Sequence, residues 1–323
     1  MQRELLTGKT FLVTGGAGFI GSHVCDILLK RSPRKVIIVD DFSIGKQSNI
    51  AHLRNKVEVV KADASSYDFM SELIQKQEVE VVFNMAVIPL PASLEKPKHC
   101  IDKNILVAST VCELLRMGKY KTLVHCSSSE AYGSALYVPM DENHPITPLT
   151  PYAASKIAAD YIALSYFRTF GLDIAVARPF NTYGPRQNEG TYAAVVPISI
   201  RRILEGQAPL IYGDGLQTRD YSYVEDIAQG IVGVYESRAT RGTVINLASG
   251  KEITIERLVR MIAKLLGYSG AIEHGMPRPG DVRRHRGDIT LARELLDYSP
   301  RTDYTDGLRK TIEWYKANHI ETG

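Results

Sequence analysis

Short apolar runs alternate with longer amphipathic segments through the first half of the chain. The apolar runs are rich in Val, Ile and Leu, and they occupy residues 10–14, 35–40, 57–62, 79–84, 121–126 and 172–177. Runs that are apolar at nearly every position are typical of strands buried on both faces of a sheet. The segments between them carry apolar residues at helical spacing, as at Ile20, Val24, Ile27 and Leu28. The pattern therefore predicts a regular alternation of strands and helices.

This alternation predicts a fold class. We expect an α/β protein built on a doubly wound, Rossmann-type parallel sheet with helices on both faces. After Arg178-Pro179 the apolar runs become sparse, and helices are predicted at 195–205, 224–237, 254–266 and 303–317. The second half thus predicts a smaller α/β lobe that closes over the first. We assign residues 1–178 and about 217–245 to the Rossmann domain, and residues 179–216 and 246–323 to the smaller, substrate-binding lobe.

The composition is that of an ordinary globular protein. The chain has 323 residues, of which 44% are hydrophobic and 23% charged, with a net charge of +3. The densest basic run, Arg283-Arg284-His285-Arg286, is short and lies close to the acidic Asp288. Such a run is usually a solvated surface, so we expect no nucleic-acid partner. No apolar run reaches membrane-spanning length, and the N-terminus does not resemble a signal peptide, so we expect no membrane association.

The cysteines and histidines indicate neither a metal site nor a disulfide framework. The four cysteines, at positions 25, 100, 112 and 126, lie inside apolar runs and have no metal-ligand or redox spacing. Buried free thiols in a reducing cytoplasm are the plain interpretation. The eight histidines are scattered, and none pairs at ligand spacing with Cys, Asp or Glu on a predicted element. We therefore expect a cytoplasmic protein without a metal cofactor.

A glycine-rich turn follows the first predicted strand. Gly15, Gly18 and Gly21 permit a tight turn, a close approach of the backbone to a pyrophosphate, and close packing of helix on strand. Phe19 and Ile20 open the following helix, whose free N–H groups and positive dipole end suit phosphate. The strand, turn and helix together predict a dinucleotide site.

Two aspartates at strand ends extend this predicted site. Asp40 ends the run 35–40, where a carboxylate can accept both adenosine ribose hydroxyls and would repel a 2′-phosphate. The next residues include no arginine, so NAD is favoured over NADP as the cofactor. Asp63 follows the next strand and could reach the adenine edge, although a turn aspartate is an equally good account of it.

A tyrosine and a lysine four residues apart provide candidate chemistry. Tyr152 and Lys156 follow Thr150-Pro151, which is typical of an N-cap and a first helical position. The spacing places both side chains on one helix face. A nearby ammonium group stabilises a phenolate, so we expect Lys156 to lower the pKa of Tyr152 towards working pH. Upstream, the serine-rich segment 127–129 ends a parallel strand and therefore faces the ligand crevice.

These motifs resemble those of one enzyme group. The glycine turn, the serine-rich strand end, the Tyr–Lys pair and the segment 178–186 together resemble the extended short-chain dehydrogenase/reductases that act on nucleotide-sugars. That group contains UDP-hexose 4-epimerases, nucleotide-hexose 4,6-dehydratases and UDP-glucuronate decarboxylases, and the resemblance covers about residues 9–317. It implies that Ser128, Tyr152 and Lys156 form the catalytic triad, that Tyr152 and Lys156 also contact the cofactor, and that Ala86 lies beside NAD.

The resemblance also implies a set of substrate contacts. It places Asn181, Arg219 and Arg278 at the nucleotide diphosphate, and Asp281 at the nucleotide ribose. Bidentate arginines suit phosphate oxygens, which agrees with their loop-like surroundings. Further substrate contacts are expected at Ser128, Ser129, Arg186, Val196 and Tyr212. A UDP-sugar is the substrate that the resemblance favours, and family members commonly form homodimers through two helices per subunit, here 97–117 and 150–170.

The resemblance leaves three reactions open. All begin when Tyr152 takes the proton of the C4 hydroxyl while hydride leaves C4, which gives a 4-keto sugar. Dehydratases typically carry Asp-Glu where this chain has Ser129-Glu130, whereas decarboxylases carry Ser-Glu and many epimerases have small or hydroxylic residues. Glu130 is therefore a candidate catalyst at C5, but Ser129 is a poor acid for eliminating water. Segment 133–139 is similar to that of some 4,6-dehydratases of N-acetylhexosamine pathways.

Other segments favour an epimerase. Segments 217–221 and 278–283 are similar to those of 4-epimerases, so a 4-epimerase is the favoured reaction. The segment 84–91 departs from the family, because Val87 stands where a second alanine is usual and Pro89 and Pro91 follow. Two prolines would stiffen a loop beside the nicotinamide and the sugar, so we expect an unusual sugar pocket.

Two alternative functions are compatible with the same predicted fold. A non-catalytic dinucleotide sensor would have lost Tyr152 or Lys156, and both are present. A simple reductase would release NADH, whereas an epimerase recycles its cofactor within one turnover, so tightly held NAD would distinguish the two.

Overall fold

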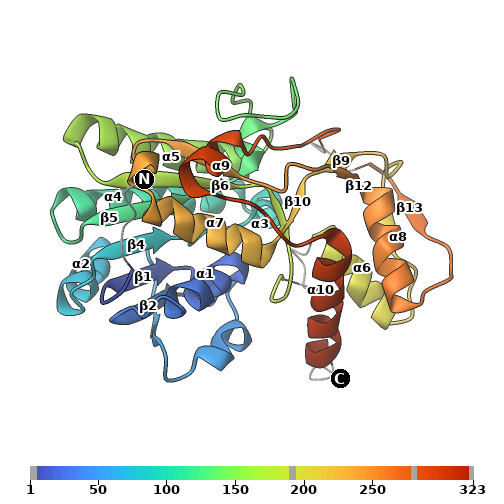
Figure 1. The fold of residues 1–323 in the computed structure, drawn as a ribbon, viewed down its shortest axis with the longest axis horizontal. Helices are drawn as coiled ribbons and strands as arrows, with labels where there is room; N and C mark the ends of the chain where they lie inside the picture. Colours follow the sequence, from blue (N-terminus) through green and yellow to red (C-terminus); the bar gives the residue numbers. More distant parts are fainter. Residues whose placement is uncertain (1–5, 189–193, 278–281, 320–323) are drawn as a thin grey trace.

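A seven-stranded parallel sheet forms the centre of the molecule (Figure 1). The computed structural model describes residues 6–188, 194–277 and 282–319. The strand order is β11-β6-β5-β4-β1-β2-β3, and every neighbouring pair is parallel. The strands are β1 (Thr10–Thr14), β2 (Lys35–Asp40), β3 (Glu58–Lys61), β4 (Val81–Asn84), β5 (Thr122–Cys126), β6 (Ile174–Pro179) and β11 (Val244–Leu247). The predicted doubly wound fold is confirmed.

The sheet separates two hydrophobic cores. Successive residues of a strand point to opposite faces, and in β1 Phe11 and Val13 join one core while Leu12 joins the other. The first core is covered by α1 (Phe19–Leu29) and α7 (Val224–Glu236). The second is covered by α2 (Tyr67–Lys76), α4 (Pro97–Arg116) and α5 (Pro151–Phe170). Burial on both faces explains why the strands are apolar at nearly every position.

The strand ends are aligned at one edge of the sheet. Thr14 at the end of β1 pairs with Asn84 of β4, which in turn pairs with His125 of β5. Segments that leave these three strands therefore begin side by side. They include the glycine turn, the stretch that leads to α3 (Leu90–Glu95), and η2 (Ser129–Tyr132). Two further short helices, η1 (Gln47–Leu53) and η3 (Arg238–Thr240), lie in connections.

The smaller lobe has its own core. The helices α6 (Val195–Leu204), α8 (Ile255–Leu266) and α10 (Tyr304–His319) lie together at the other end of the molecule (Figure 1). Val196 and Ile200 of α6 and Leu258 and Ile262 of α8 are buried in this core. The short strands are β7 (Asn181–Tyr183), β8 (Leu210–Tyr212), β9 (Thr218–Arg219), β10 (Tyr221–Tyr223), β12 (Ile253–Thr254) and β13 (Glu273–Gly275).

The C-terminal part of the chain returns to the larger lobe. β11 is the edge strand of the central sheet, and α9 (Thr290–Leu296) packs against α7 and β11. The sequence analysis assigned residues 246–323 to the smaller lobe, but β11 ends at Leu247 and Ala292 of α9 is buried in the first core. Neither element was predicted, since each is too short to show a clear periodic pattern.

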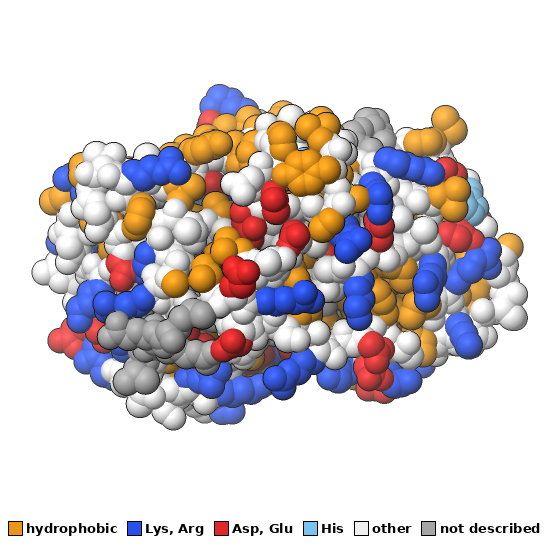
Figure 2. All heavy atoms as spheres, turned by 45° about the horizontal axis from the view of Figure 1, so that its top comes forward, with side chains coloured by type: hydrophobic (Ala, Val, Ile, Leu, Met, Phe, Trp, Pro, Cys, Tyr) orange, Lys and Arg blue, Asp and Glu red, His pale blue; other side chains and the backbone are white. Residues whose placement is uncertain are grey.

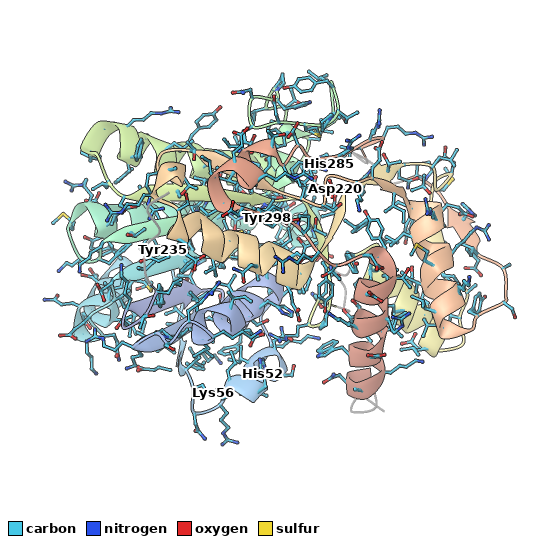
Figure 3. All side chains as sticks on the ribbon, in the orientation of Figure 1. His52, Lys56, Asp220, Tyr235, His285 and Tyr298 are labelled. Carbon is cyan, nitrogen blue, oxygen red and sulfur yellow. The ribbon has the colours of Figure 1, made fainter. Side chains whose placement is uncertain are left out.

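One buried carboxylate joins segments where the lobes meet. Asp220 and His285 lie near this junction in Figure 3. Oδ1 of Asp220 accepts hydrogen bonds from the backbone N–H and the hydroxyl of Ser249, at 2.8 and 2.6 Å. Oδ2 accepts the N–H groups of Gly250 and Gly287, at 2.9 and 3.2 Å. Burial raises the pKa of Asp220 to about 6, although these hydrogen bonds act to lower it.

The outer surface is mixed in character. Figure 2 shows acidic side chains gathered near the middle of one face, among apolar and basic ones. A cleft beside α5 and β11 is lined by Asp141, Glu142, Asp288 and Glu294. Among the described residues, no helix combines the length and the apolar character that crossing a membrane requires.

Candidate active site

A cavity of about 580 Å³ opens along the carboxyl edge of the sheet and reaches the smaller lobe. This volume lies within the range typical of ligand sites, about 300–1,000 Å³. Its lining comes from both halves of the chain. The predicted site residues that line it are Gly15, Gly18, Phe19, Ile20, Gly21, Asp40, Asp63, Ala86, Ser128, Glu130, Tyr152, Lys156, Asn181, Tyr212 and Arg219.

The glycine turn forms the floor of one end of the cavity. Gly15 has a φ of +64°, and a Cβ there would lie 2.7 Å from the Cα of Ala86. The Thr14 hydroxyl causes this close approach, because it accepts the N–H groups of Met85 and Ala86 at 3.1 and 3.2 Å. A Cβ on Gly21 would lie 2.3 Å from the carbonyl oxygen of Gly15. Both positions therefore require glycine.

The helix after the turn presents its N-terminus to the cavity. Among the described residues, none caps the N-terminus of α1 with a side chain, and its first turn carries no acid. Gly18, Phe19, Ile20 and Gly21, at this helix end, all line the cavity. Unsatisfied N–H groups and the positive end of the helix dipole bind phosphate well. A close-packed glycine turn before such a helix end fits the pyrophosphate of a dinucleotide.

Asp40 lies at the same end of the cavity. Its carboxylate accepts the N–H groups of Ala17 and Phe42, each at 2.9 Å. Burial raises the pKa of Asp40, and these two hydrogen bonds oppose the rise. A Cβ on Gly45 would lie 2.7 Å from the carboxylate, so the loop after β2 closes tightly over it. The fixed carboxylate fits the two hydroxyls of an adenosine ribose and disfavours a 2′-phosphate.

Asp63 also lines the cavity, but as part of a turn. Its Oδ1 accepts the N–H and hydroxyl of Ser65 at 2.9 and 2.7 Å, and Oδ2 pairs with Lys103 of α4. Burial alone would raise the pKa of Asp63, but the hydrogen bonds from Lys103 and Ser65 lower it. This aspartate is therefore part of a turn and also lines the cofactor end of the cavity.

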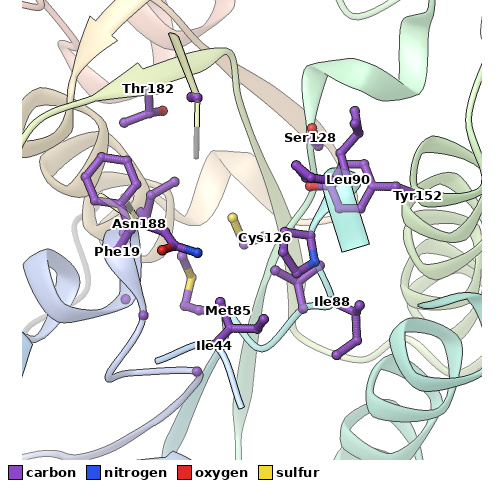
Figure 4. Close-up of a pocket in the computed structure, with 18 of the residues that line it drawn as sticks. Phe19, Ile44, Met85, Ile88, Leu90, Cys126, Ser128, Tyr152, Thr182 and Asn188 are labelled. Carbon is purple, nitrogen blue, oxygen red and sulfur yellow. The ribbon is translucent and has the colours of Figure 1, made fainter. Parts of the chain in front are cut away.

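The candidate catalytic pair lies on the first turns of α5. The Thr150 hydroxyl accepts the N–H of Ala153 at 3.1 Å and Pro151 occupies the first turn, so the predicted helix start is confirmed. Tyr152 and Ser128 lie close together in Figure 4. Nζ of Lys156 donates to the carbonyl of Cys126 at 2.5 Å. Helical spacing thus brings Tyr152 and Lys156 to the end of β5.

The electrostatics of this pair differ from the expectation. Burial raises the pKa of Tyr152, and the contact that lowers it is the hydrogen bond with Ser128. The spacing predicted that Lys156 would lower this pKa, but its ammonium instead donates to the Cys126 carbonyl. Burial also lowers the pKa of Lys156. Desolvation is the reason, because both side chains are enclosed between α5 and the sheet.

A buried polar network lies beneath the pair. Oδ2 of Asp160, one turn after Lys156, accepts the Ser127 hydroxyl at 2.5 Å and Nη2 of Arg178 at 2.8 Å. Nε2 of His125 lies 3.4 Å from Oδ1 of Asp160. Burial alone would raise the pKa of Asp160, but His125 and the charge of Arg178 lower it to about 2. The network ties α5 to β5 and β6, and so fixes Tyr152 relative to Ser128.

The smaller lobe contributes polar groups to the far end of the cavity. Asn181 begins β7, and its buried Oδ1 has no hydrogen-bond partner among the described residues. Arg219 is largely buried on β9, where Nη1 donates to the Thr218 carbonyl at 2.8 Å. Tyr212 ends β8. A buried amide and a guanidinium facing one cavity suit the oxygens of a diphosphate.

Other predicted substrate residues do not line the cavity. Arg186 pairs instead with Asp26 of α1 at 2.6 Å, and its backbone has a φ of +67°. Val196 is fully buried in the core of the smaller lobe. Ser129 is only 2% exposed and is turned into the protein at the start of η2. The predicted contacts Arg278 and Asp281 lie outside the described residues.

The structure also adds residues that the sequence analysis missed. Asn104 of α4 is buried beside the cavity, and its amide bonds both backbone groups of Ile88. A polar residue on the apolar stripe of a helix is a signal that could have identified it. Thr182, Gln187, Asn188 and Tyr221 line the cavity from the smaller lobe, and their sequence carried no comparable signal.

Comparison with known proteins agrees with this geometry. The protein family described as GDP-mannose 4,6 dehydratase matches residues 12–311. A putative UDP-glucose 4-epimerase of Methanocaldococcus jannaschii is 38% identical over 311 residues, 95% of this chain and 99% of that protein. The crystal structure of a UDP-glucose 4-epimerase from Thermotoga maritima with UDP-glucose is 32% identical and has a TM-score of 0.91, over 96% of this chain and 99% of that one.

A structure with bound cofactor is similar over the same length. The dTDP-glucose 4,6-dehydratase of Streptomyces venezuelae, solved with NAD bound, is 28% identical with a TM-score of 0.91, over 97% of this chain and 98% of that one. NAD is therefore the cofactor of this chain, and the glycine turn and Asp40 line the end of the cavity whose geometry suits it. The chain belongs to the epimerase/dehydratase family of extended short-chain dehydrogenase/reductases, and it is an NAD-dependent enzyme of that family.

Proposed function

We propose that this chain is a UDP-sugar 4-epimerase that uses NAD and works through a transient 4-keto intermediate. The observation that carries the proposal is the contrast between Ser129 and Glu130. Dehydratases of the family typically have an acid at the first of these positions, but here it is a serine, buried and outside the cavity lining. The proposal also fits the relatives, because the Methanocaldococcus and Thermotoga proteins are both named as UDP-glucose 4-epimerases.

Each residue of the candidate catalytic triad would have its own role in this reaction. Tyr152 takes the proton of the C4 hydroxyl, while the Ser128 hydroxyl holds that oxygen in place. Lys156 lies one helical turn further along α5 and donates to the Cys126 carbonyl, which holds the start of the helix that carries Tyr152 against the end of β5. Bound NAD supplies a reversible hydride acceptor, which allows C4 to become a ketone and then an alcohol again.

The smaller lobe would hold the part of the substrate that does not react. Asn181 and Arg219 face the cavity from β7 and β9, at some distance along the chain from Tyr152. If they bind the diphosphate, the keto sugar can turn over without leaving the enzyme. Return of hydride to the opposite face then gives the C4 epimer, with no net consumption of cofactor.

Glu130 is the observation that supports a second candidate. It lines the cavity, where a carboxylate could act at C5, as a 4,6-dehydratase or a UDP-glucuronate decarboxylase requires. In the epimerase, Glu130 would be a polar contact of the sugar. The two candidates differ in the mass of their products.

Product analysis tests the proposal directly. The purified enzyme with NAD should convert a UDP-hexose into a product of unchanged mass and different chromatographic retention. A panel of UDP-glucose, UDP-N-acetylglucosamine, UDP-glucuronate and dTDP-glucose would be followed by liquid chromatography and mass spectrometry. Loss of water would establish a dehydratase and loss of carbon dioxide a decarboxylase, and either result would refute the epimerase.

The second proposal concerns assembly as a homodimer. Helices α4 and α5 pack side by side. Leu106 on α4, Met117 directly after it, and Tyr161 and Phe170 on α5 are exposed. Exposed apolar side chains that gather on two neighbouring helices are typical of protein interfaces. An isologous contact would build a four-helix bundle from two copies of this pair.

Light scattering on a sizing column tests the dimer. The wild-type protein should elute at twice its monomer mass of 35.9 kDa. Leu106→Arg should shift the mass towards the monomer, because it places an unpaired charge in the interface. Met276→Arg, at a side chain that is 84% exposed in the smaller lobe, should leave the mass unchanged. A monomeric wild type would contradict the proposal.

The cysteines support a third, coarser proposal. All four are free and buried, and no two of them form a disulfide. Free thiols persist in reducing compartments, so we place the enzyme in the cytoplasm.

A further inference from the structure

The loop after β4 forms an apolar wall of the cavity. The wall is residues 87–91, which run from this loop into the first turn of α3; all five line the cavity, and all are valine, isoleucine, leucine or proline. Leu90 lies in the same part of the cavity as Ser128 and Tyr152, and Ile88 lies nearby (Figure 4). Since the sugar must meet Tyr152 and Ser128, this wall is placed where the sugar lies.

The wall is held rigidly against the catalytic helix. The Asn104 side chain accepts the N–H of Ile88 at 2.8 Å and donates to its carbonyl at 3.2 Å. Its Nδ2 also bonds the Ser155 hydroxyl at 2.9 Å, and that hydroxyl donates to the carbonyl of Tyr152 at 2.7 Å. Pro89 begins the turn into α3, where the Ser93 hydroxyl donates to the Leu90 carbonyl at 2.6 Å. A fixed wall selects among ligands better than a mobile one.

The charges near the wall disfavour an anionic sugar. Among the described residues that line the cavity, the cationic side chains are Lys103, Lys156 and Arg219. Lys103 pairs with Asp63 at the cofactor end, and Arg219 lies in the smaller lobe. Lys156 donates to the Cys126 carbonyl beneath Tyr152. A carboxylate at C6 would therefore be desolvated against the apolar wall, which is costly for an anion.

We propose that residues 87–91 are the specificity element of the sugar site, and that they select a nucleotide-sugar whose hexose carries a methyl-bearing substituent, either an N-acetyl or a 6-deoxy group. A uronate is the least favoured substrate. The inference rests on the proposed function for its choice of substrate class. One methyl group in an apolar pocket is worth about 10- to 200-fold in discrimination, which sets the size of the expected effect.

The proposed selectivity of the wall can be tested by measuring the binding and turnover of matched UDP-sugars. Isothermal titration would give Kd, and initial rates would give kcat/KM, for UDP-N-acetylglucosamine, UDP-6-deoxyglucose, UDP-glucose and UDP-glucuronate. At least one of the two methyl-bearing sugars should bind at least about 10-fold more tightly than UDP-glucose, and UDP-glucuronate should bind most weakly. Which of the two binds more tightly reports whether the C2 or the C6 substituent faces the wall.

Two asparagine variants isolate the contribution of Leu90. Leu90→Asn keeps the size of the side chain but makes the wall polar, and should reduce the methyl preference by about 10-fold, mainly through Kd and KM. Leu94→Asn lies on the same short helix but is 63% exposed, and should keep the wild-type preference. The proposal that residues 87–91 select the sugar would be refuted by either of two results. One is an equal preference in the Leu90→Asn and wild-type proteins, and the other is tight binding of UDP-glucuronate. If the enzyme binds the methyl-bearing sugars selectively but its product has lost water, the proposed epimerase reaction is refuted and the proposed selectivity of residues 87–91 still holds.

Discussion

Replacing Tyr152 with phenylalanine should lower kcat by about 100- to 10,000-fold, the range that a positioned general acid–base contributes. Phenylalanine keeps the ring on α5 but removes the hydroxyl that faces Ser128. Binding of NAD should remain, because the glycine turn and Asp40 are untouched. Chromatographic assay of the epimer gives the rate, and absorbance of the released nucleotide after denaturation gives the bound cofactor.

The pH profile adds a second measure of the same residue. Burial raises the pKa of Tyr152, so the phenol is the dominant form near neutral pH. The phenolate fraction therefore grows as pH rises, and kcat/KM of the wild type should increase with pH above neutrality. Tyr152→Phe should lose this increase along with the rate.

Tyr161→Phe is the matched control for this prediction. It lies on the same helix and is 54% exposed, outside the catalytic cavity, so its kcat should equal that of the wild type. A Tyr152→Phe enzyme within about 3-fold of wild-type kcat would show that the phenol does not transfer the proton in a step that limits the rate.

Neutralising Asp160 should lower the stability of the fold. Asp160→Asn removes the carboxylate that accepts Arg178 at 2.8 Å, and leaves that guanidinium charged and fully buried. Breaking a buried ion pair in this way typically costs about 3–5 kcal/mol. Urea unfolding at pH 7 should therefore show a free energy of unfolding that is lower by about this amount.

The pH dependence of this loss follows from the pKa of Asp160. The group is held at about 2 in the folded protein, below its ordinary value of 3.8. A lowered folded pKa means that the stabilisation is complete above the unfolded pKa and is lost as pH falls from about 4 towards 2. The deficit of Asp160→Asn should therefore be the same at pH 7 and at pH 6.

Two further variants separate the buried pair from ordinary surface charge. Asp102→Asn breaks an exposed pair with Lys98 on α4, and should cost less than about 1 kcal/mol. Adding Arg178→Gln to Asp160→Asn should recover part of the loss, because the orphaned charge is then gone. A single Asp160→Asn variant as stable as Asp102→Asn would mean that the network contributes nothing to the folded state.

Local patterns were sufficient for most of the fold. The six predicted strands correspond to β1–β6, because burial on both faces of a parallel sheet forces continuous apolar runs. The strand β11 and the helix α9 escaped prediction, since four and seven residues carry little periodic signal. Their places at the sheet edge are decided by packing against β6 and α7.

The candidate site likewise has some features that local patterns predict and others that depend on distant contacts. Gly15, Asp40, Tyr152 and Lys156 could be predicted as cavity residues because their places depend on spacing within one strand–turn–helix unit or one helix turn. The sequence by itself predicted a dinucleotide end of the cavity and a catalytic Tyr–Lys pair, and the residues of both predictions line one cavity. The orientations of Ser129 and Arg186 depend on contacts with distant segments, and there the expectation of a substrate contact did not match the structure.

Only the tertiary structure decided the remaining features. The hydrogen bond between Asn104 and Ile88 joins residues that are 16 apart in the sequence. The ion pair of Asp160 with Arg178 joins residues that are 18 apart and lie on different elements. The pKa of Tyr152 rises because folding removes water from around it, which no local spacing encodes. Spacing along the chain sets which side chains share a face, whereas burial and long-range pairing set what those side chains can do.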